Sequence, residues 1–444
     1  MQGVTLTFAI IISLLAITLR PSYALAAYIT GLLWYPGFLA VSIGTIDILV
    51  GRIVVMVLLL RCLFDDQIRS KFTWSRLDTC VALSMLVYVG VWLSAVPDPL
   101  LSLIENRGGF LMDTWFAYMA ARFIVTDRAR LISLVKCVSI VLVPLAILGV
   151  IEAFTGWQPF IPLWRYCPWR QEIKILEQRW GLTRAVGPFS HPILFGGGFA
   201  MFLPLIYYLR HQRNYWRTLA YVLSAVALVG ALSSMSSGPW VMAIVVIFCL
   251  VMERYKHWVK PLIGFFVFSC ISIGVLSNRP FYHVLASFAN PLGGSGWHRA
   301  RLIDVAIEHF DEWWLAGYRG QDPGWGQYLG MAFTDVTNEF ILAGVKYGIL
   351  GVIALCLVLT VAFHGIISTY KKTIHPVIKS LYWALGSVLF SVIITWFSVS
   401  FFGQLMPLFY CVLGIIGSSF HFLGYERTKR PELLINSNRR LISS

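Results

Sequence analysis

Long apolar runs, separated by short polar or basic connections, extend over almost the whole of this chain. Representative runs are residues 46–64, 131–154 and 340–364, and many approach the ~20 residues that a helix needs to cross a bilayer. Lipid offers no hydrogen-bond partners to backbone N–H and C=O groups, so unbroken apolar runs of this length cross it as helices. The sequence therefore predicts an all-α, polytopic integral membrane protein with about 12–13 transmembrane helices.

The composition supports this class and excludes a soluble protein. Hydrophobic residues make up 58% of the 444 positions and charged residues 13%, about half of the roughly 25% that is usual in soluble domains. The net charge of +14 would suggest nucleic acid as a partner of a soluble protein. Here we ascribe it to the Lys and Arg that gather in cytoplasmic loops of membrane proteins, and we expect no nucleic-acid partner.

The basic connections predict the orientation of the chain. Connections rich in Lys and Arg, such as residues 69–76, 210–217 and 254–260, alternate with two long polar connections. By the positive-inside rule, the basic connections and the C-terminus are cytoplasmic. We therefore expect a multi-pass protein of the bacterial inner (cytoplasmic) membrane, with its long connections on the periplasmic side. The first run has no charged n-region and no clear cleavage site, which predicts a retained helix rather than a signal peptide.

The same pattern divides the chain into four parts. Transmembrane helices are expected within residues 1–277, interrupted by an outer connection at about 156–187. Residues 278–336 form a large, partly helical outer loop, which we expect to be functional because long loops without a role are uncommon. Transmembrane helices resume within residues 337–424, and residues 425–444 form a basic cytoplasmic tail.

The cysteines do not indicate a metal centre. Eight cysteines are present, nearly all in or beside apolar runs, and no zinc-type spacing occurs among them. We therefore expect no metal, no cofactor and no disulfide framework.

The two outer connections carry arginines that the orientation rule does not require. A guanidinium group binds phosphate oxygens in a bidentate manner, so arginines gathered outside the membrane favour a phosphorylated substrate. The simpler alternative for each of them is a surface ion pair with a nearby acid, such as Glu172, Glu177, Asp304 or Glu308. The outer arginines are Arg165, Arg170, Arg179 and Arg184 in the first connection, and Arg279, Arg299, Arg301 and Arg319 in the second.

Helical phase separates two of these arginines. In a helix over about 299–314, Arg299 shares a face with the apolar Ile303 and Phe310, whereas Arg301 precedes Asp304 by three residues and Glu308 by seven. Side chains three or four apart on a helix are neighbours. Arg301 is therefore expected in a surface ion pair. Arg299 points with the apolar face, which makes it the stronger functional candidate.

A second candidate lies just before the run that starts near Pro188. Proline suits the first turn of a helix, and the backbone N–H groups there can face an anion to which Arg184 adds charge. His191 has two interpretations, because it is either a hydrogen-bonded residue at the start of the helix or a proton-transfer group.

A third candidate element begins at Thr337. Asn338 and Glu339 open the last long apolar region, where they either take part in chemistry or act as a helix cap and a first-turn acid. Aromatic residues accompany the outer loop and suit either stacking on sugars or anchoring at the membrane interface. These aromatics are Trp297, Trp313, Trp314 and Trp325.

Three motifs in this order resemble those of the O-antigen ligase and O-antigen polymerase-like family of polytopic membrane glycosyltransferases. The first is Arg184-x-x-Gly187-x-Phe189-x-His191-Pro192, and the second is the segment from Arg299 to a Gly-containing turn at Gly317. The third is an Asn followed by nine residues, Gly, two residues and Gly. Asn338, Gly348 and Gly351 match that spacing. The resemblance covers about residues 130–420.

The resemblance implies a metal-independent glycosyltransferase active on the outer face of the membrane. Its substrates would be an undecaprenyl-diphosphate-linked glycan and the hydroxyl of an acceptor glycan, with membrane lipid and other polysaccharide export proteins as further partners. The catalytic candidates are Arg184, Arg299 and Glu339, since fixed cations can stabilise the charge of a departing diphosphate. The candidates for binding substrate are His191, His298, Arg301, Asn338, Trp297 and Thr337.

Thr337 departs from the family pattern, because the ligases carry a histidine at that position. A hydroxyl cannot act as the base, so Glu339, Asp335, His298 and His191 remain open as candidates. The departure favours a polymerase of exopolysaccharide or O-antigen repeat units over an O-antigen ligase that acts on a lipid or another acceptor. A non-enzymatic transporter of lipid-linked oligosaccharides is the competing class, and it would need ionisable residues along a path at membrane depth.

Overall fold

The computed structural model describes residues 1–94, 98–169, 178–278, 280–288 and 296–422. Several residues named above lie outside the described ranges: Arg170, Glu172, Glu177, Arg279 and the tail 425–444.

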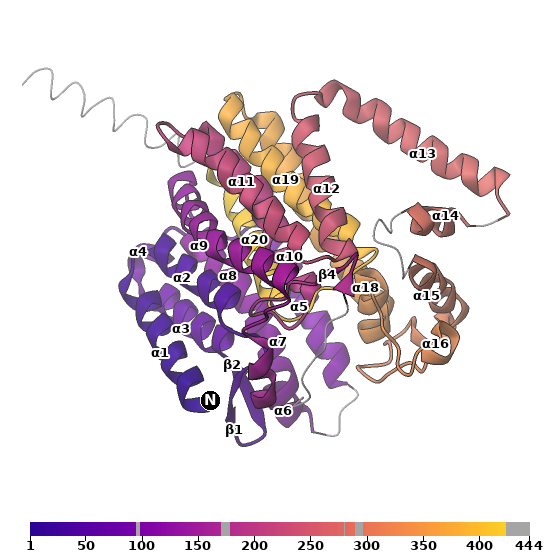
Figure 1. The fold of residues 1–444 in the computed structure, drawn as a ribbon, viewed down its shortest axis with the longest axis horizontal. Helices are drawn as coiled ribbons and strands as arrows, with labels where there is room; N and C mark the ends of the chain where they lie inside the picture. Colours follow the sequence, from indigo (N-terminus) through magenta and orange to yellow (C-terminus); the bar gives the residue numbers. More distant parts are fainter. Residues whose placement is uncertain (95–97, 170–177, 279, 289–295, 423–444) are drawn as a thin grey trace, which may run out of the picture.

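Helices make up most of the described chain, and the longer ones form one bundle (Figure 1). In these residues seven helices are long and apolar enough to cross a membrane. The all-α, polytopic architecture is thereby confirmed, while the number of 12–13 spans stays a prediction. The main helices are α1 (Gln2–Thr18), α2 (Pro21–Trp34), α3 (Val50–Phe64), α5 (Arg76–Leu93), α8 (Ala117–Ile124), α9 (Arg128–Thr155), α10 (Pro192–Tyr208), α11 (Trp216–Ser233), α12 (Ser237–Met252), α13 (Val259–Leu276), α18 (Glu339–Lys372), α19 (Pro376–Trp396) and α20 (Leu405–Ser419).

Shorter elements join these helices. Four short strands form two antiparallel hairpins, β1 (Ala40–Ile43) with β2 (Ile46–Leu49) and β3 (Gln178–Arg179) with β4 (Leu182–Thr183). The short helices are α4 (Asp66–Arg69), α6 (Pro99–Ser102), α7 (Gly109–Leu111), α14 (Phe281–Phe288), α15 (Gly296–Glu308), α16 (Phe310–Trp313) and α17 (Gly326–Leu329).

Residues 24–43 form another apolar run, for which hydropathy predicts a membrane helix, but this run is interrupted in the structure. Helix α2 ends at Trp34, the segment with Pro36 and Gly37 follows, and β1 pairs with β2 across a turn in which Gly44 has φ +63°. Proline removes a backbone donor, and positive φ favours glycine, so these residues end the helix although their neighbours are apolar. Hydropathy alone did not distinguish an apolar hairpin from a continued helix.

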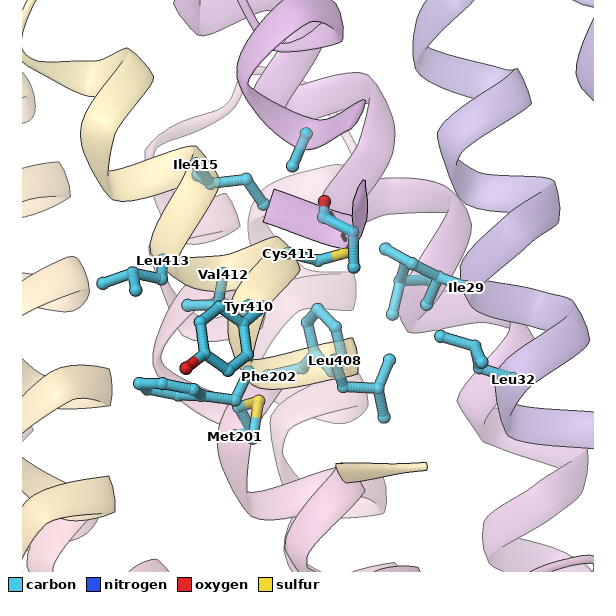
Figure 2. Packing of buried hydrophobic residues seen from close by; sticks show 14 of the residues in the cluster. Ile29, Leu32, Met201, Phe202, Leu408, Tyr410, Cys411, Val412, Leu413 and Ile415 are labelled. Carbon is cyan, nitrogen blue, oxygen red and sulfur yellow. Dashed lines mark hydrogen bonds between the residues drawn. The ribbon is translucent and has the colours of Figure 1, made fainter. Parts of the chain in front are cut away.

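The core of the bundle lies around α10 and α20. Nearly every residue of these two helices is buried. Figure 2 shows side chains of α20, among them Leu408 and Cys411, beside Met201 and Phe202 of α10 and Ile29 of α2. Small residues let backbones approach closely in such bundles. The geometry at Gly414 follows this rule, because a Cβ there would overlap the carbonyl oxygen of Tyr118.

Contacts group the connections at two opposite ends of the bundle. At the end with the basic connections, Arg122 pairs with Asp78 (2.6 Å) and Arg210 pairs with Glu253 (2.7 Å). At the other end, the Gln404 amide donates to the carbonyl of Pro188 (3.3 Å), which joins the first long connection to the segment before α20. The alternation of connections seen in the sequence therefore corresponds to two distinct ends of the fold.

The outer loop contacts the bundle where α18 is broken. Gly348 has φ 69° and ψ −168° inside that helix. The carbonyl of Val345 accepts the N–H of Tyr318 (2.6 Å), and the N–H of Ile349 donates to Trp314 (2.7 Å). A Cβ at Gly348 would lie 2.5 Å from the Leu315 carbonyl oxygen, so only glycine fits the contact. The loop therefore packs against α18, whereas α13, in which no residue is buried, stands apart from the bundle (Figure 1).

Candidate functional site

A cavity of about 560 Å³ lies at the end of the bundle where the long connections meet. Its walls come from five separate parts of the chain, which only the fold brings together. The segments that contribute are the β3–β4 hairpin with Arg184, the start of α10, the start of α12, the outer loop from Trp297 to Thr337, and the turn 398–402 between α19 and α20.

Arg184 and Arg299, predicted separately from sequence, both line this cavity. Arg184 Nη2 donates to Ser236 Oγ (2.9 Å), and Arg299 Nη2 donates to Ser237 Oγ (3.0 Å). Ser236 is the residue before α12 and Ser237 its first residue. The two guanidinium groups are therefore held on consecutive serines at the N-terminus of a helix, where the helix dipole adds partial positive charge.

Both arginines are nearly buried, with 8% of Arg184 and 9% of Arg299 exposed. Within the described residues, Nε and Nη1 of Arg299 have no hydrogen-bond partner. Burial, and then the nearby charge of Arg179, lower the pKa of the Arg299 guanidinium below its ordinary value. Buried donors without a partner are costly, so this geometry suits an anionic ligand that would complete the set.

Arg179 is a third arginine in the cavity wall. From the sequence it could not be distinguished from the other outer arginines. It lies in β3, and a turn formed by Trp180 (φ 53°) and Gly181 (φ 74°) lets this strand pair with β4. A two-residue turn with both φ positive matches the twist of a hairpin. Its Nη1 lies 3.4 Å from the carbonyl oxygen of Met235, immediately before the two serines. In the sequence, the Trp180-Gly181 pair between Arg179 and Arg184 is the feature that could have indicated this hairpin turn.

The backbone around Arg184 is fixed by a buried carboxylate. Glu152, near the end of α9, accepts the N–H groups of Val186 (2.8 Å) and Gly187 (2.9 Å) on one oxygen, and the residue is 0% exposed. Gly187 has φ 50°. The Arg-x-x-Gly spacing therefore reflects a tight turn held by a charge-assisted acceptor, and it fixes where the arginine side chain starts.

The helix after this turn begins later than predicted. Helix α10 starts at Pro192 rather than near Pro188, and His191 caps it by accepting the N–H of Ile193 on Nδ1 (3.1 Å). The carbonyl of Pro188 instead accepts from Gly37 and Gln404. His191 therefore both caps α10 and lines the cavity.

The third motif contributes a helix cap. Asn338 Oδ1 accepts the N–H groups of Phe340 (3.0 Å) and Ile341 (3.2 Å), so the cap of α18 is Asn338 rather than the Thr337 hydroxyl. Thr337 lines the cavity, and its buried Oγ1 has no hydrogen-bond partner within the described ranges. Glu339 accepts the N–H of Phe401 (2.8 Å) and does not belong to the cavity wall. This position does not favour a direct catalytic role for Glu339.

Arg301 also lies away from the cavity wall. It pairs with Glu308 (2.8 Å) and lies 3.9 Å from Asp304, as helical phase indicates for a surface ion pair. This placement does not favour its prediction as a substrate-binding residue. Its neighbours Trp297 and His298 do line the cavity, with the Trp297 side chain exposed and His298 Nε2 3.2 Å from the Asp335 carbonyl.

The other predicted aromatics have structural positions. Trp313 and Trp325 belong to a small apolar cluster under the outer loop, where Trp313 packs against Gly344 of α18. Trp314 is partly exposed, and its carbonyl accepts from Ile349. Of the four tryptophans, only Trp297 lines the cavity, so it is the one placed to stack on a sugar.

Within the described ranges, no group of three His, Cys, Asp or Glu side chains is placed to hold a metal ion. Comparison with models of known families and with curated proteins finds no match to this chain.

Proposed function

We propose that this protein is a membrane glycosyltransferase of bacterial surface-polysaccharide biosynthesis. In this proposal it transfers a glycan from undecaprenyl diphosphate to a hydroxyl of an acceptor glycan, which makes it an exopolysaccharide or O-antigen polymerase. The observation that carries the proposal is the meeting of Arg184, Arg299 and Arg179 in one cavity, two of them on consecutive serines.

The proposed chemistry needs fixed positive charge more than any other group. As the glycosidic bond to the diphosphate breaks, negative charge grows on the phosphate oxygens. Donors that are already oriented toward that charge stabilise the transition state without reorganisation. The guanidinium groups at the start of α12 meet this requirement, and Trp297 offers an apolar face for the sugar.

Polymerisation is favoured over ligation because Thr337 stands where the similar ligases carry a histidine. Thr337 lines the cavity, but its hydroxyl cannot act as a base at neutral pH. The proposed acceptor is accordingly a second carrier-linked glycan, and the site faces the periplasm in this proposal.

The ionisable residues of the bundle do not favour a transporter. A transport path would need polar groups available at membrane depth. Arg52 is paired with Asp113 (2.7 Å), and Arg122 with Asp78 (2.6 Å). Arg61 bonds to the carbonyl oxygens of Ala16 and Leu19. These groups stabilise helix packing, while the cationic residues of the cavity gather at one end of the bundle.

The test uses purified protein in lipid bilayers with undecaprenyl-diphosphate-linked repeat units, and chain length is followed on a gel. We expect the native protein to make a ladder of polymers. Arg184→Ala and Arg299→Ala should each lower the rate by on the order of 10²–10³, the usual cost of losing one oriented charge-stabilising donor. Arg→Lys should also lower it strongly at either position, since a point charge does not reproduce the planar fork.

Arg301→Ala is the matched control, because Arg301 lies on the same helix as Arg299 but outside the cavity wall. It should retain the native rate within about threefold, as expected for an exposed ion pair. The proposal is wrong if the native protein forms no glycosidic bond with any carrier-linked repeat unit, or if Arg299→Ala and Arg301→Ala have equal effects.

A further inference from the structure

We infer that His298 is the general base that activates the acceptor hydroxyl, and that it replaces the histidine missing at position 337. The inference rests on the proposed glycosyl transfer and assigns one step of it to a residue. Its basis is a difference between the two histidines of the cavity wall. The backbone partner of His191 engages Nδ1 of the ring, whereas the backbone partner of His298 engages Nε2.

His191 has its Nδ1 lone pair occupied. The N–H of Ile193 donates to Nδ1 at 3.1 Å, so the neutral ring carries its proton on Nε2. A base needs a lone pair directed at the acceptor, and for His191 that lone pair is used to cap α10. His191 is therefore suited to donate a hydrogen bond into the cavity rather than to remove a proton.

His298 has the complementary arrangement. Its Nε2 lies 3.2 Å from the carbonyl oxygen of Asp335. A carbonyl oxygen can only accept, so Nε2 carries the proton of the neutral ring, and Nδ1 has the lone pair. No hydrogen bond to a described residue engages Nδ1. Arg299 directly follows His298, and both residues line the cavity proposed to hold the diphosphate.

The remaining candidates fit less well. Glu339 accepts the N–H of Phe401 and lies outside the cavity wall. Asp335 lines the cavity, and its backbone carbonyl orients the His298 ring.

In the transfer step, the acceptor O–H bond breaks, its proton goes to His298 Nδ1, and its oxygen forms a bond to the anomeric carbon of the donor glycan. The bond from that carbon to the diphosphate oxygen breaks, and its electron pair stays on the diphosphate, which the arginines hold. The imidazolium then releases the proton to water. The charged or titratable groups that line the cavity with His298 are Arg179, Arg184 and Arg299, together with His191 and Asp335.

The test compares His298→Gln with the native protein in lipid bilayers containing carrier-linked repeat units. The Gln amide can still donate to the Asp335 carbonyl, but it offers no base. We expect kcat to fall by about 10²–10⁴, the usual contribution of general acid–base catalysis, while binding of undecaprenyl diphosphate changes less than about threefold. The native kcat should rise with pH through an inflection, as expected for general-base catalysis, and the variant should lack that inflection.

His283→Gln serves as the control, since His283 belongs to the outer loop but pairs with Asp304 outside the cavity wall. It should keep both the native kcat and the inflection. The inference is overturned if His298→Gln retains kcat within about tenfold, or if it loses binding and kcat together. An equal loss of kcat in Asp335→Asn would assign the base to that carboxylate instead. Each of these results leaves the proposed function standing, because the native protein still forms polymer; only a native protein without activity removes both.

Discussion

The N–H of Ile349 donates to the carbonyl of Trp314 at 2.7 Å, across the point where α18 is broken at Gly348. The N–H of Tyr318 donates to the Val345 carbonyl at 2.6 Å on the other side of the break. Two backbone hydrogen bonds therefore join the outer loop to a membrane helix. Because the loop also carries Arg299, the break in α18 helps to fix where that arginine meets the cavity.

Gly348→Ala should destabilise the protein. The φ of 69° and ψ of −168° belong to a region that is essentially confined to glycine, and occupying it with another residue costs about 1–3 kcal/mol. The new Cβ would also lie 2.5 Å from the Leu315 carbonyl oxygen. Thermal unfolding in detergent, followed by circular dichroism, should show a lower midpoint. Limited proteolysis should cut the outer loop earlier than in the native protein.

Gly90→Ala provides the comparison for this substitution. Gly90 lies in α5, and a Cβ there would meet no atom within 4 Å. Alanine is the better helix former by roughly 0.5–1 kcal/mol, so this variant should match or exceed the native midpoint. Equal midpoints for the two variants would contradict the role assigned to the break.

Asn338→Ala should cost about 0.5–2 kcal/mol, because it removes the side-chain cap of α18. Thr337→Ala should leave the unfolding midpoint nearly unchanged, since the Thr337 hydroxyl has no partner in the described part of the chain. The two variants are compared by unfolding in detergent. A larger loss of stability for Thr337→Ala than for Asn338→Ala would show that Asn338 is not the main cap of α18.

Glu152 offers a separate test of how Arg184 is positioned. Glu152→Gln keeps an oxygen that can accept the N–H groups of Val186 and Gly187. Glu152→Leu removes it and leaves two buried donors without a partner, at about 1–3 kcal/mol for each group. Binding of undecaprenyl diphosphate should therefore persist in the first variant and weaken at least tenfold in the second. Equal binding by both would show that the carboxylate does not hold this turn.

The orientation in the membrane can be tested with cysteines placed at the two ends of the bundle. Gln321→Cys lies in the outer loop and Arg213→Cys in a basic connection, and both positions are exposed. In intact cells, an impermeant maleimide should label the first and not the second, because the basic connections are expected in the cytoplasm. Labelling of Arg213→Cys alone would reverse the predicted orientation.

Much of the architecture could be predicted because apolar length and charge are local properties of a sequence. The runs that became α9 and α18 are long and strongly apolar. The hairpin of β1 and β2 could not be distinguished from a helix, since its residues are as apolar as those before it. The start of α10 was placed too early because Pro188 suits a helix start, whereas its carbonyl is used by Gly37 and Gln404.

Burial of a side chain could be predicted where it depends on which face of one helix the residue occupies. Phase alone separated Arg299, which is buried, from Arg301, which is paired with Glu308. Phase gave no information about Arg179, because a hairpin turn brings it to the cavity. From the sequence, Glu339 was as suitable for chemistry as the arginines. Its hydrogen bond from the Phe401 N–H depends on the turn 398–402, which is distant in the sequence.

The partners of the cavity arginines have a consequence for the end of the catalytic cycle. Arg179 and Arg299 contact a carbonyl and a hydroxyl, and neither forms an ion pair with any carboxylate that the structure describes. No described carboxylate therefore cancels their positive charge. In the proposed reaction the departing carrier gains an ionisable oxygen, so it leaves more negative than the donor that arrived. Such a site would hold its product more tightly than its substrate, and turnover would then be limited by release of the spent carrier, with a rapid first round of bond formation followed by a slower steady rate.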